Sequence, residues 1–310
     1  MEKKKRYGET VKAQLLASTR DKLYHFMMAG ETLRGAVVNG TRMVNEMRWN
    51  HELGVLETLV LGHAYLAAVL LSAGLKGKDR LSIGVECSGP IKGLSVEANA
   101  YGEVRGYLKQ VPIPIQAPLE SFNLSPFFGA GFLSVTRYPE GAKHPFTGKV
   151  MMENGSLAKD LALYHLRSEQ IPTSFSLSVV FDANGEVQGA GGLFLQAMPG
   201  AEDQTLAHLE ALIKDLPSLG HVVNAAGFPE QWLADTFGSM APRLLGRRGV
   251  EFMCHCNRDH IRTMLRMLNR DELAEMGRNG PFPVQIKCHN CNTDYRFEQD
   301  ELIAMSKRTN

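Results

Sequence analysis

The sequence lacks an excess of charge of either sign and lacks the common signatures of catalysis. Its 34 Lys and Arg residues nearly balance 33 Asp and Glu residues, so the formal net charge at pH 7 is +1. Such a balance gives no electrostatic drive toward nucleic acid or an anionic membrane. A nucleophile elbow, a phosphate-binding loop, a dinucleotide fingerprint and a zinc-protease helix are all missing. We therefore expect no catalytic residues, no cofactor-binding loop and no enzymatic activity.

The sequence also lacks a secretion signal and a membrane span. Residues 1–6 are basic, but no apolar core follows them. The longest apolar stretch, 53–75, carries Glu57 and His63, which indicates a buried helix and not a membrane helix. We expect a cytoplasmic protein with no membrane partner. In that compartment, close cysteine pairs are more often metal ligands or redox sensors than structural disulfides.

Cysteine is scarce, yet four of the five cysteines crowd into the last fifth of the chain. They form a C-x-C pair and a C-x-x-C pair: Cys254, Cys256, Cys288 and Cys291. Two such pairs can converge on one tetrahedral ion, and zinc suits four soft thiolates. The spacing predicts one Zn²⁺ per chain in the reduced form. The same four sulfurs could instead form two local disulfides, so the site is a candidate redox switch.

Other metal-binding or reactive side chains lie beside these pairs or far from them. His255, His260 and His289 are close in sequence to the cysteines. Since four thiolates already complete a tetrahedral structural site, we expect the histidines at most to tune the sulfurs from outside it. Cys87 falls on the apolar face of a predicted strand, which is typical of an inert core thiol.

Alternating apolar and polar residues predict an α+β core domain over 1–198. Strands are predicted at 32–38, 81–88, 94–98, 174–181 and 187–196, with Asn184-Gly185 as the turn between the last two. Helical periodicity predicts helices at 54–74 and 157–166, with Ser156 as a candidate cap of the second. Hairpins dominate over βαβ repeats, which is why we favour α+β over α/β.

The pattern changes after Met198-Pro199-Gly200 and predicts a helical linker over 199–249. An amphipathic helix is expected there, and a short helix is expected around Trp232 after Pro229. The apolar face of the first helix consists of Leu206, Leu209, Leu212, Ile213 and Leu216. Glycine and proline recur at short intervals from 220 to 249, so we predict that this linker has low local stability.

Residues 250–310 are predicted to form a small zinc-binding domain. Asn257 is a candidate cap of a helix whose apolar face would consist of Ile261, Met264, Leu265 and Leu268. A strand is expected before the second cysteine pair. Tyr295 and Phe297 would share one face of the strand after it, so a metal would hold a short helix against a hairpin.

Two other classes of function are compatible with parts of the pattern. A zinc-stabilised nucleic-acid-binding regulator would use the basic stripe Arg258, Arg262, Arg266 and Arg270. Acidic and basic residues are equal in number over 250–310, however, and nucleic acid needs uncompensated phosphate contacts. We therefore interpret the stripe as a solvated helix face. The other class, a hydrolase or thiol oxidoreductase in the core, lacks a recognisable nucleophile motif.

Segments spread over nearly the whole chain carry a resemblance to one known family. They are Arg34-Gly35, 102–106 (GEVRG), 168–173 (SEQIPT), 190–193 (AGGL) with Gln196 and Pro199-Gly200, and the two cysteine pairs followed by Tyr295 and Phe297. Together they resemble the redox-regulated holdase heat-shock chaperones of bacteria, the thirty-three-kilodalton chaperonin family. Asn257 departs from the serine that members commonly carry there.

The resemblance implies an ATP-independent chaperone that binds unfolding proteins under oxidative and heat stress. It implies an inactive reduced form with zinc on the four cysteines. Oxidation would form the disulfides Cys254–Cys256 and Cys288–Cys291, release zinc and unfold the linker. The implied partners are unfolded or partly unfolded client proteins and, after oxidation, a second copy of the chain.

Overall fold

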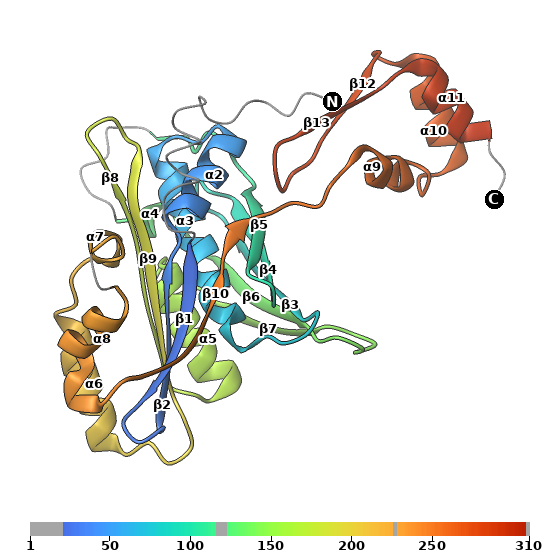
Figure 1. The fold of residues 1–310 in the computed structure, drawn as a ribbon. Coiled ribbons are helices and arrows are strands. Elements are labelled where there is room, and N and C mark those ends of the chain that lie inside the picture. The colour runs from blue at the N-terminus through green and yellow to red at the C-terminus, as the bar shows by residue number, and fades with distance from the viewer. Residues whose placement is uncertain (1–20, 116–122, 226–227, 308–310) are drawn as a thin grey trace. The chain divides into compact units, whose positions relative to one another are not determined.

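Most of the strands assemble into two sheets, which are followed along the chain by a separate small unit. The computed structural model describes residues 21–115, 123–225 and 228–307, and the chain divides into two compact units between Met253 and Cys254 (Figure 1). The basic segment 1–6 lies outside the described residues. The division between residues 253 and 254 lies at neither of the boundaries predicted at 198 and 249.

The larger unit is built from antiparallel ladders. The five-stranded sheet has the order β10-β1-β2-β9-β8 and contains β1 (Lys22–Met28), β2 (Leu33–Asn39), β8 (Thr173–Phe181), β9 (Val187–Ala197) and β10 (Arg243–Gly249). The six-stranded sheet has the order β11-β5-β4-β3-β6-β7 and contains β3 (Arg80–Cys87), β4 (Gly93–Asn99), β5 (Glu103–Leu108), β6 (Gly131–Tyr138), β7 (Phe146–Met151) and β11 (Glu251–Phe252). Among the described strands, β11 and β5 form the one parallel pair. The α+β class is confirmed, as are the five predicted strands.

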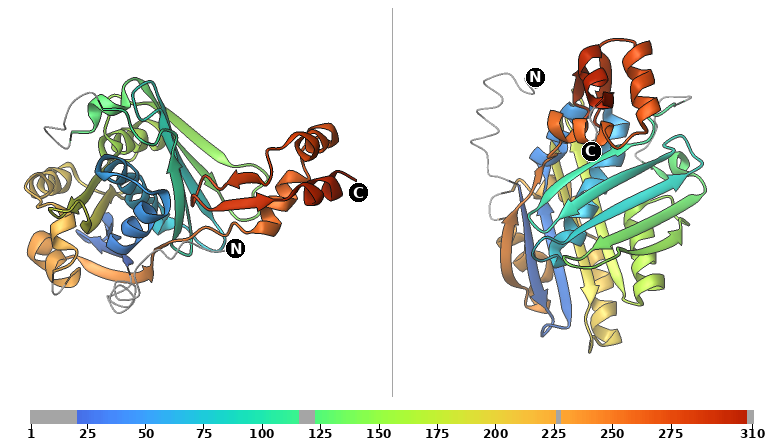
Figure 2. Two further views of the ribbon diagram at one scale, coloured as in Figure 1. Left: turned by 90° about the horizontal axis from the view of Figure 1, so that it is seen from above. Right: turned by 90° about the vertical axis from the view of Figure 1, so that its right-hand side faces the viewer.

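Helix α3 (Val55–Leu71) lies between the two sheets and contacts strands of both (Figure 2). It follows α2 (Thr41–His51) and ends in the 3₁₀ turn η1 (Ser72–Gly74). Of the helices that the structure describes, only the one at 55–74 is long and apolar enough to cross a membrane. Most of this helix is buried inside the protein. A helix that is apolar on all sides suits a site with protein on all sides, so the predicted core helix is confirmed.

Two local predictions in this unit were wrong in detail. Cys87 is the last residue of β3 and is half-buried instead of lying in the core, although burial still raises the pKa of its thiol. Ser156 occupies the N-cap position of α5 (Leu157–Tyr164), but its side chain makes no capping bond. The carboxylate of Asp160 accepts hydrogen bonds from the backbone N–H groups of Glu153, Asn154 and Ser156 instead.

Short helices of the predicted linker cover the outer face of the five-stranded sheet. They are α6 (Asp203–Lys214), α7 (Leu219–Val222), α8 (Glu230–Phe237) and the 3₁₀ turn η3 (Gly238–Met240). Their buried side chains and those of the sheet form one apolar cluster: Tyr24, Phe26, Met28, Leu33, Val37, Leu193 and Leu195 from the strands, and Leu209, Leu219, Leu233, Phe237 and Met240 from the linker. Of the predicted apolar face of α6, Leu209 is buried and the others are partly buried.

The linker also contains a strand that its sequence did not predict. Residues 243–249 form β10, which pairs antiparallel with β1, whereas we expected a helical segment. Of its seven residues, four are exposed and three are half-buried. Because β10 is a short edge strand rich in arginine and glycine, its sequence lacks the alternation of apolar and polar residues that would have predicted a strand.

The glycine cluster 189–192 serves backbone packing. A Cβ atom on Gly189 would lie 1.8 Å from the carbonyl oxygen of Gly220 at the start of α7. Glycine at this position therefore allows α7 to approach β9 closely. The whole cluster lies within strand β9.

Asp21, at the start of β1, is expected to make stability depend on pH. Its buried carboxylate accepts a hydrogen bond of 2.7 Å from the N–H of Met43, and burial raises its pKa from 3.8 to about 7. Between these values the folded chain holds a proton that the unfolded chain has lost. The free energy of unfolding should therefore fall as the pH rises through this window, by up to about 4 kcal/mol. Asp21→Asn should flatten this fall in urea denaturation at pH 4 to 8. Exposed Asp235→Asn should leave it unchanged, and an equally steep fall in Asp21→Asn would exclude Asp21 as its source.

The smaller unit has its own apolar core. It contains α9 (Arg258–Leu265), α10 (Arg270–Asn279), β12 (Val284–Lys287), β13 (Asp294–Phe297) and α11 (Gln299–Lys307). Its buried apolar cluster consists of Ile261, Leu265, Leu273, Tyr295, Phe297, Leu302 and Met305. The predicted face of α9 is confirmed for Ile261 and Leu265. Met264 is exposed although it lies within α9, and Leu268 is exposed beyond the end of the helix at Leu265.

Candidate metal centre

The first cysteine pair lies in the extended segment just before α9. The side-chain oxygen of Asn257 accepts a hydrogen bond of 2.8 Å from the N–H of His260, which confirms the predicted cap. This cap fixes the point at which the chain turns from the extended segment into the helix. Cys256, the residue before the cap, is thereby held at the start of α9.

The second pair lies in the tight turn between β12 and β13. The N–H of Cys288 donates to the carbonyl of Thr293 at 2.9 Å, and the N–H of Asn292 donates back to the carbonyl of Cys288 at 2.8 Å. Asn292 has φ of 56°, in the left-handed region that Asn tolerates better than most residues. The turn thus presents both sulfurs at the end of the hairpin.

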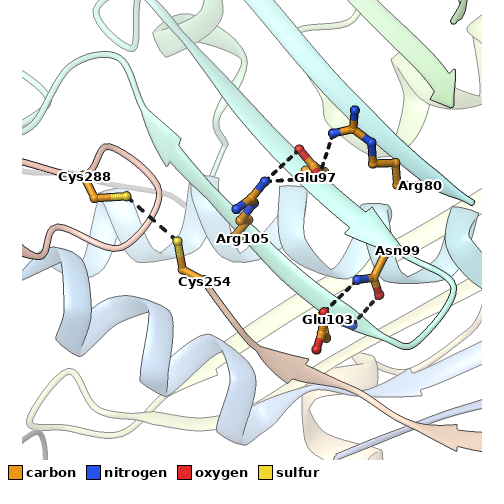
Figure 3. Close-up of polar contacts among 7 residues, drawn as sticks. All are labelled: Arg80, Glu97, Asn99, Glu103, Arg105, Cys254 and Cys288. Carbon is orange, nitrogen blue, oxygen red and sulfur yellow. Dashed lines mark hydrogen bonds and ion pairs between the residues drawn. The ribbon is translucent and has the colours of Figure 1, made fainter. Parts of the chain in front are cut away.

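The four cysteine sulfurs converge on one point. All four Sγ atoms lie within 4.8 Å of one another. The Sγ atoms of Cys254 and Cys288 are 3.9 Å apart (Figure 3), and those of Cys256 and Cys291 are 3.2 Å apart. Four sulfurs about 2.3 Å from a tetrahedral ion would be separated by about 3.8 Å. The cluster could therefore hold a metal ion, and its all-sulfur donor set is consistent with zinc.

The neighbouring histidines do not join this cluster. His255, His260 and His289 are exposed, and among the described residues the group of close ligand atoms consists of the four cysteine sulfurs. A saturated set of four sulfurs with no open position is typical of a structural site and not of a catalytic one.

The sulfurs share protons unequally. Hydrogen bonds from Cys254 and Cys288 lower the pKa of Cys291, whereas hydrogen bonding to Cys254 and Cys291 raises the pKa of Cys288. Burial raises the pKa of Cys256 to about 11. A bound divalent cation would favour the thiolate forms of its sulfur ligands.

Two polar neighbours of the cluster were not predicted from sequence. The hydroxyl of Tyr295 donates to the Sγ of Cys256 at 3.1 Å, and the Oγ1 of Thr293 lies 3.2 Å from the Sγ of Cys291. Tyr295 was assigned only to the apolar face of β13, on which it indeed lies buried. The one sequence signal for these two contacts is a hydroxyl-bearing residue at both the second and the fourth position after Cys291.

The basic stripe does not form one helix face. Arg258 donates to Glu301 at 2.6 Å and lies over the ring of Phe297, and Arg262 pairs with Glu301 at 3.5 Å. Arg266 lies beyond the end of α9, and Arg270 opens α10. The first two arginines therefore neutralise acidic groups of the small unit itself.

Residues 102–106, one of the segments that carry the family resemblance, form ion pairs on the six-stranded sheet through Arg105. Glu97 on β4 lies 3.3 Å from both Arg80 on β3 and Arg105 on β5, and Asn99 donates to Glu103 at 2.7 Å (Figure 3). These contacts join three adjacent strands. They give this segment a structural role.

Other segments of the resemblance meet in a polar network in the core. Helix α5 continues into a single π-helical turn, η2 (His165–Glu169), in which the Nδ1 of His165 lies 3.0 Å from Glu169. Gln196 on β9 accepts from Arg34 at 2.9 Å and donates to Thr173 at 2.9 Å. The structure buries His165 and shows that these side chains bind one another.

Comparisons with known proteins agree with this architecture. The family model described as "Hsp33 protein" matches residues 21–298. The curated 33 kDa chaperonin of Desulforamulus reducens is 35% identical over 269 residues, which are 86% of this chain and 91% of the relative. That of Levilactobacillus brevis is 32% identical over 92% of this chain and 97% of the relative.

A solved structure has the same fold. The crystal structure of the 33 kDa chaperonin of Thermotoga maritima superimposes with a TM-score of 0.84 at 31% sequence identity. The match covers 93% of this chain and 98% of that one. The sequence similarity and the similarity of fold therefore extend over the same, nearly complete length.

Proposed function

Because this chain belongs to the Hsp33 family, we propose that it is a cytoplasmic, ATP-independent chaperone whose four clustered cysteines switch it on when they are oxidised. The observation that carries the proposal is the convergence of the four sulfurs within 4.8 Å. Its functional parts are the core at 1–198, the metastable linker at 199–249 and the redox switch at 250–310. Its partners are unfolding proteins in oxidative and heat stress.

In the reduced form the ligands are Cys254, Cys256, Cys288 and Cys291, and the ion is one Zn²⁺ per chain. When bound, zinc would supply the charge that keeps all four thiolates deprotonated. The four sulfurs then join the start of α9 to the β12–β13 hairpin. A unit with so few buried side chains needs such a cross-link, so its folding free energy depends on the metal.

Oxidation removes the charge that holds the cation. Two thiolates lose two electrons to an oxidant such as hypochlorous acid, which is reduced to chloride and hydroxide, and one disulfide forms. Two such steps give Cys254–Cys256 and Cys288–Cys291. Disulfide sulfurs are neutral and no longer bind the ion, so the small unit loses its cross-link. The i, i+2 disulfide closes a small ring, which makes it easy to reduce again.

The linker then unfolds and exposes apolar surface. Its helices are short, and α6 contributes one fully buried side chain, Leu209, to the cluster on the sheet. Such a segment has little local stability of its own. When it leaves, the apolar strand face beneath it becomes available to clients and to a second copy of the chain.

A light-scattering assay of a heat-denatured client tests the proposal. Zinc-loaded reduced protein should not protect the client, and protein oxidised with hypochlorous acid should. Equal protection by both forms would make the metal purely structural. An absence of protection by either form would exclude the chaperone function.

The Tyr295 hydroxyl is expected to strengthen metal binding. Tyr295→Phe removes the donor to the sulfur of Cys256 but keeps the buried ring. Losing one such hydrogen bond to a ligand should weaken zinc affinity roughly 10- to 100-fold in chelator competition. Tyr101→Phe, on an exposed turn of the larger unit, is the matched control. Equal affinities of the two variants would exclude this role.

A further inference from the structure

Strand β10 is weakly anchored for a strand of a core sheet. It pairs with β1 alone, at the edge of the five-stranded sheet, and the register shifts at a bulge between His25 and Phe26 (Figure 1). None of its residues is fully buried, whereas Leu23 and Phe26 on β1 are at most 1% exposed. Leu244 is its one side chain packed against the apolar cluster. Its hold on the core therefore rests on the backbone ladder and on polar contacts.

Arg248 provides the most extensive of these polar contacts. Its guanidinium donates to the carbonyl of Ala100 at 2.7 Å, and to the carbonyl and hydroxyl of Ser72 at 2.5 and 2.6 Å. Ser72 is completely buried at the end of α3. One side chain thus ties β10 to a helix end and to the β4–β5 turn. Residues 250–253 connect β10 to Cys254 and include β11, whose pairing with β5 and whose buried Phe252 must also give way before loss of structure in the small unit reaches this strand.

The edge of β1 beneath β10 would be a long, firmly supported template. On its other side β1 pairs with β2 over its whole length, from Lys22 opposite Asn39 to Met28 opposite Leu33. The strand therefore stays in place when β10 leaves. It would then present a row of unpaired N–H and C=O groups, to which another extended chain can add.

We infer that the β1 edge covered by β10 is a strand-addition site for extended segments of unfolded clients, and that Arg248 holds β10 on this site in the inactive form. The inference rests on the proposed chaperone function and names the surface and the chemistry of its partner. In the inactive form β10 is an intramolecular competitor of the client.

The contacts of β10 show what such an occupant needs. The half-buried positions carry Leu244, Gly246 and Arg248, of which Arg248 serves to hold β10 in place, and a Cβ on Gly246 would meet only the ring of His25, at 3.6 Å. The ion pair between Arg243 and Glu31 is exposed and contributes little. The fitting segment is thus extended, with small or apolar side chains at alternate positions and no required charge. Because backbone hydrogen bonds carry most of the affinity, many client sequences can bind.

A reversible tether between β1 and β10 tests the inference. Lys22 and Gly249 are opposite residues in the ladder, and a Cβ on Gly249 meets no atom within 4 Å. We would place Lys22→Cys and Gly249→Cys in a full-length chain whose five native cysteines are serine, so that redox state controls only the tether. The probe is reduced and carboxymethylated lactalbumin, and the readouts are its affinity and hydrogen exchange of 22–28.

With the tether reduced, we expect the protein to bind the probe and 22–28 to gain protection when it does. With the tether closed, affinity should fall at least tenfold, while each single-cysteine variant should bind equally under both conditions. Equal binding with the tether open and closed, or no added protection of 22–28, would overturn the inference. No binding even with the tether open would instead overturn the proposed activation by loss of the metal site, and the inference with it.

The role of Arg248 in holding β10 on β1 is tested separately in the protein with its native cysteines. Arg248→Ala should bind the probe several-fold more tightly than wild type in the reduced, zinc-loaded form, and Arg248→Lys should lie between them. Zinc content should stay at one per chain in all three. If the amides of residues 243–249 exchange no faster in Arg248→Ala than in wild type, Arg248 does not hold β10 in place.

Discussion

Replacing Cys288 and Cys291 together by serine is expected to abolish stoichiometric zinc binding and to unfold the small unit. The four sulfurs lie within 4.8 Å of one another, so the double variant removes half of one ligand set. Structural zinc contributes on the order of 10 kcal/mol to the folding of such modules, far more than their small cores supply. Metal analysis per chain and the NMR dispersion of residues 254–307 measure the two effects.

The matched control is Cys87→Ser, because Cys87 is half-buried at the end of β3 in the other unit. This variant should keep one zinc per chain and the redox response. A Cys288→Ser/Cys291→Ser protein that still carries one zinc per chain would exclude the four-sulfur site. It would direct attention to the exposed His255 and His289 as substitute ligands.

The sequence was most informative where function depends on local spacing. A C-x-C and a C-x-x-C pair need only a turn and a helix cap to bring their sulfurs together, and Asn257 supplies that cap. Strands such as β3 and β4 were recognisable because one face of each is buried, which produces alternation. The long helix α3 was recognisable because it is buried on all sides.

Features that depend on distant partners were not predictable. The alternation of β10 is invisible because neither of its faces is fully buried. The contact of Tyr295 with Cys256 joins β13 to the segment before α9, 39 residues away in the sequence, and cannot be read from either residue alone. The same holds for the contact of His165 with Gln196, which lies 31 residues away on β9. Asp160, and not Ser156, supports the start of α5 because the preceding loop folds back over its carboxylate.

The second large effect is expected from Phe237→Ala, which should activate the chaperone without an oxidant. Phe237 is fully buried in the cluster between the linker and the sheet, and its ring lies edge-on to Trp232 with centroids 5.8 Å apart. Truncating such a side chain costs about 3–5 kcal/mol. This is a large share of the stability of a typical domain and more than a short, glycine-punctuated linker can lose.

The test separates the linker from the switch, because zinc content and client binding report on different parts of the chain. Phe237→Ala should keep one zinc per chain, exchange amides in 203–240 faster and suppress client aggregation while reduced. Asp235→Ala, at an exposed position of α8, should behave like wild type. If Phe237→Ala opens the linker and still fails to protect a client, linker release is not sufficient for activity. Cysteine oxidation would then have to produce client binding through the small unit itself, by a step other than release of the linker.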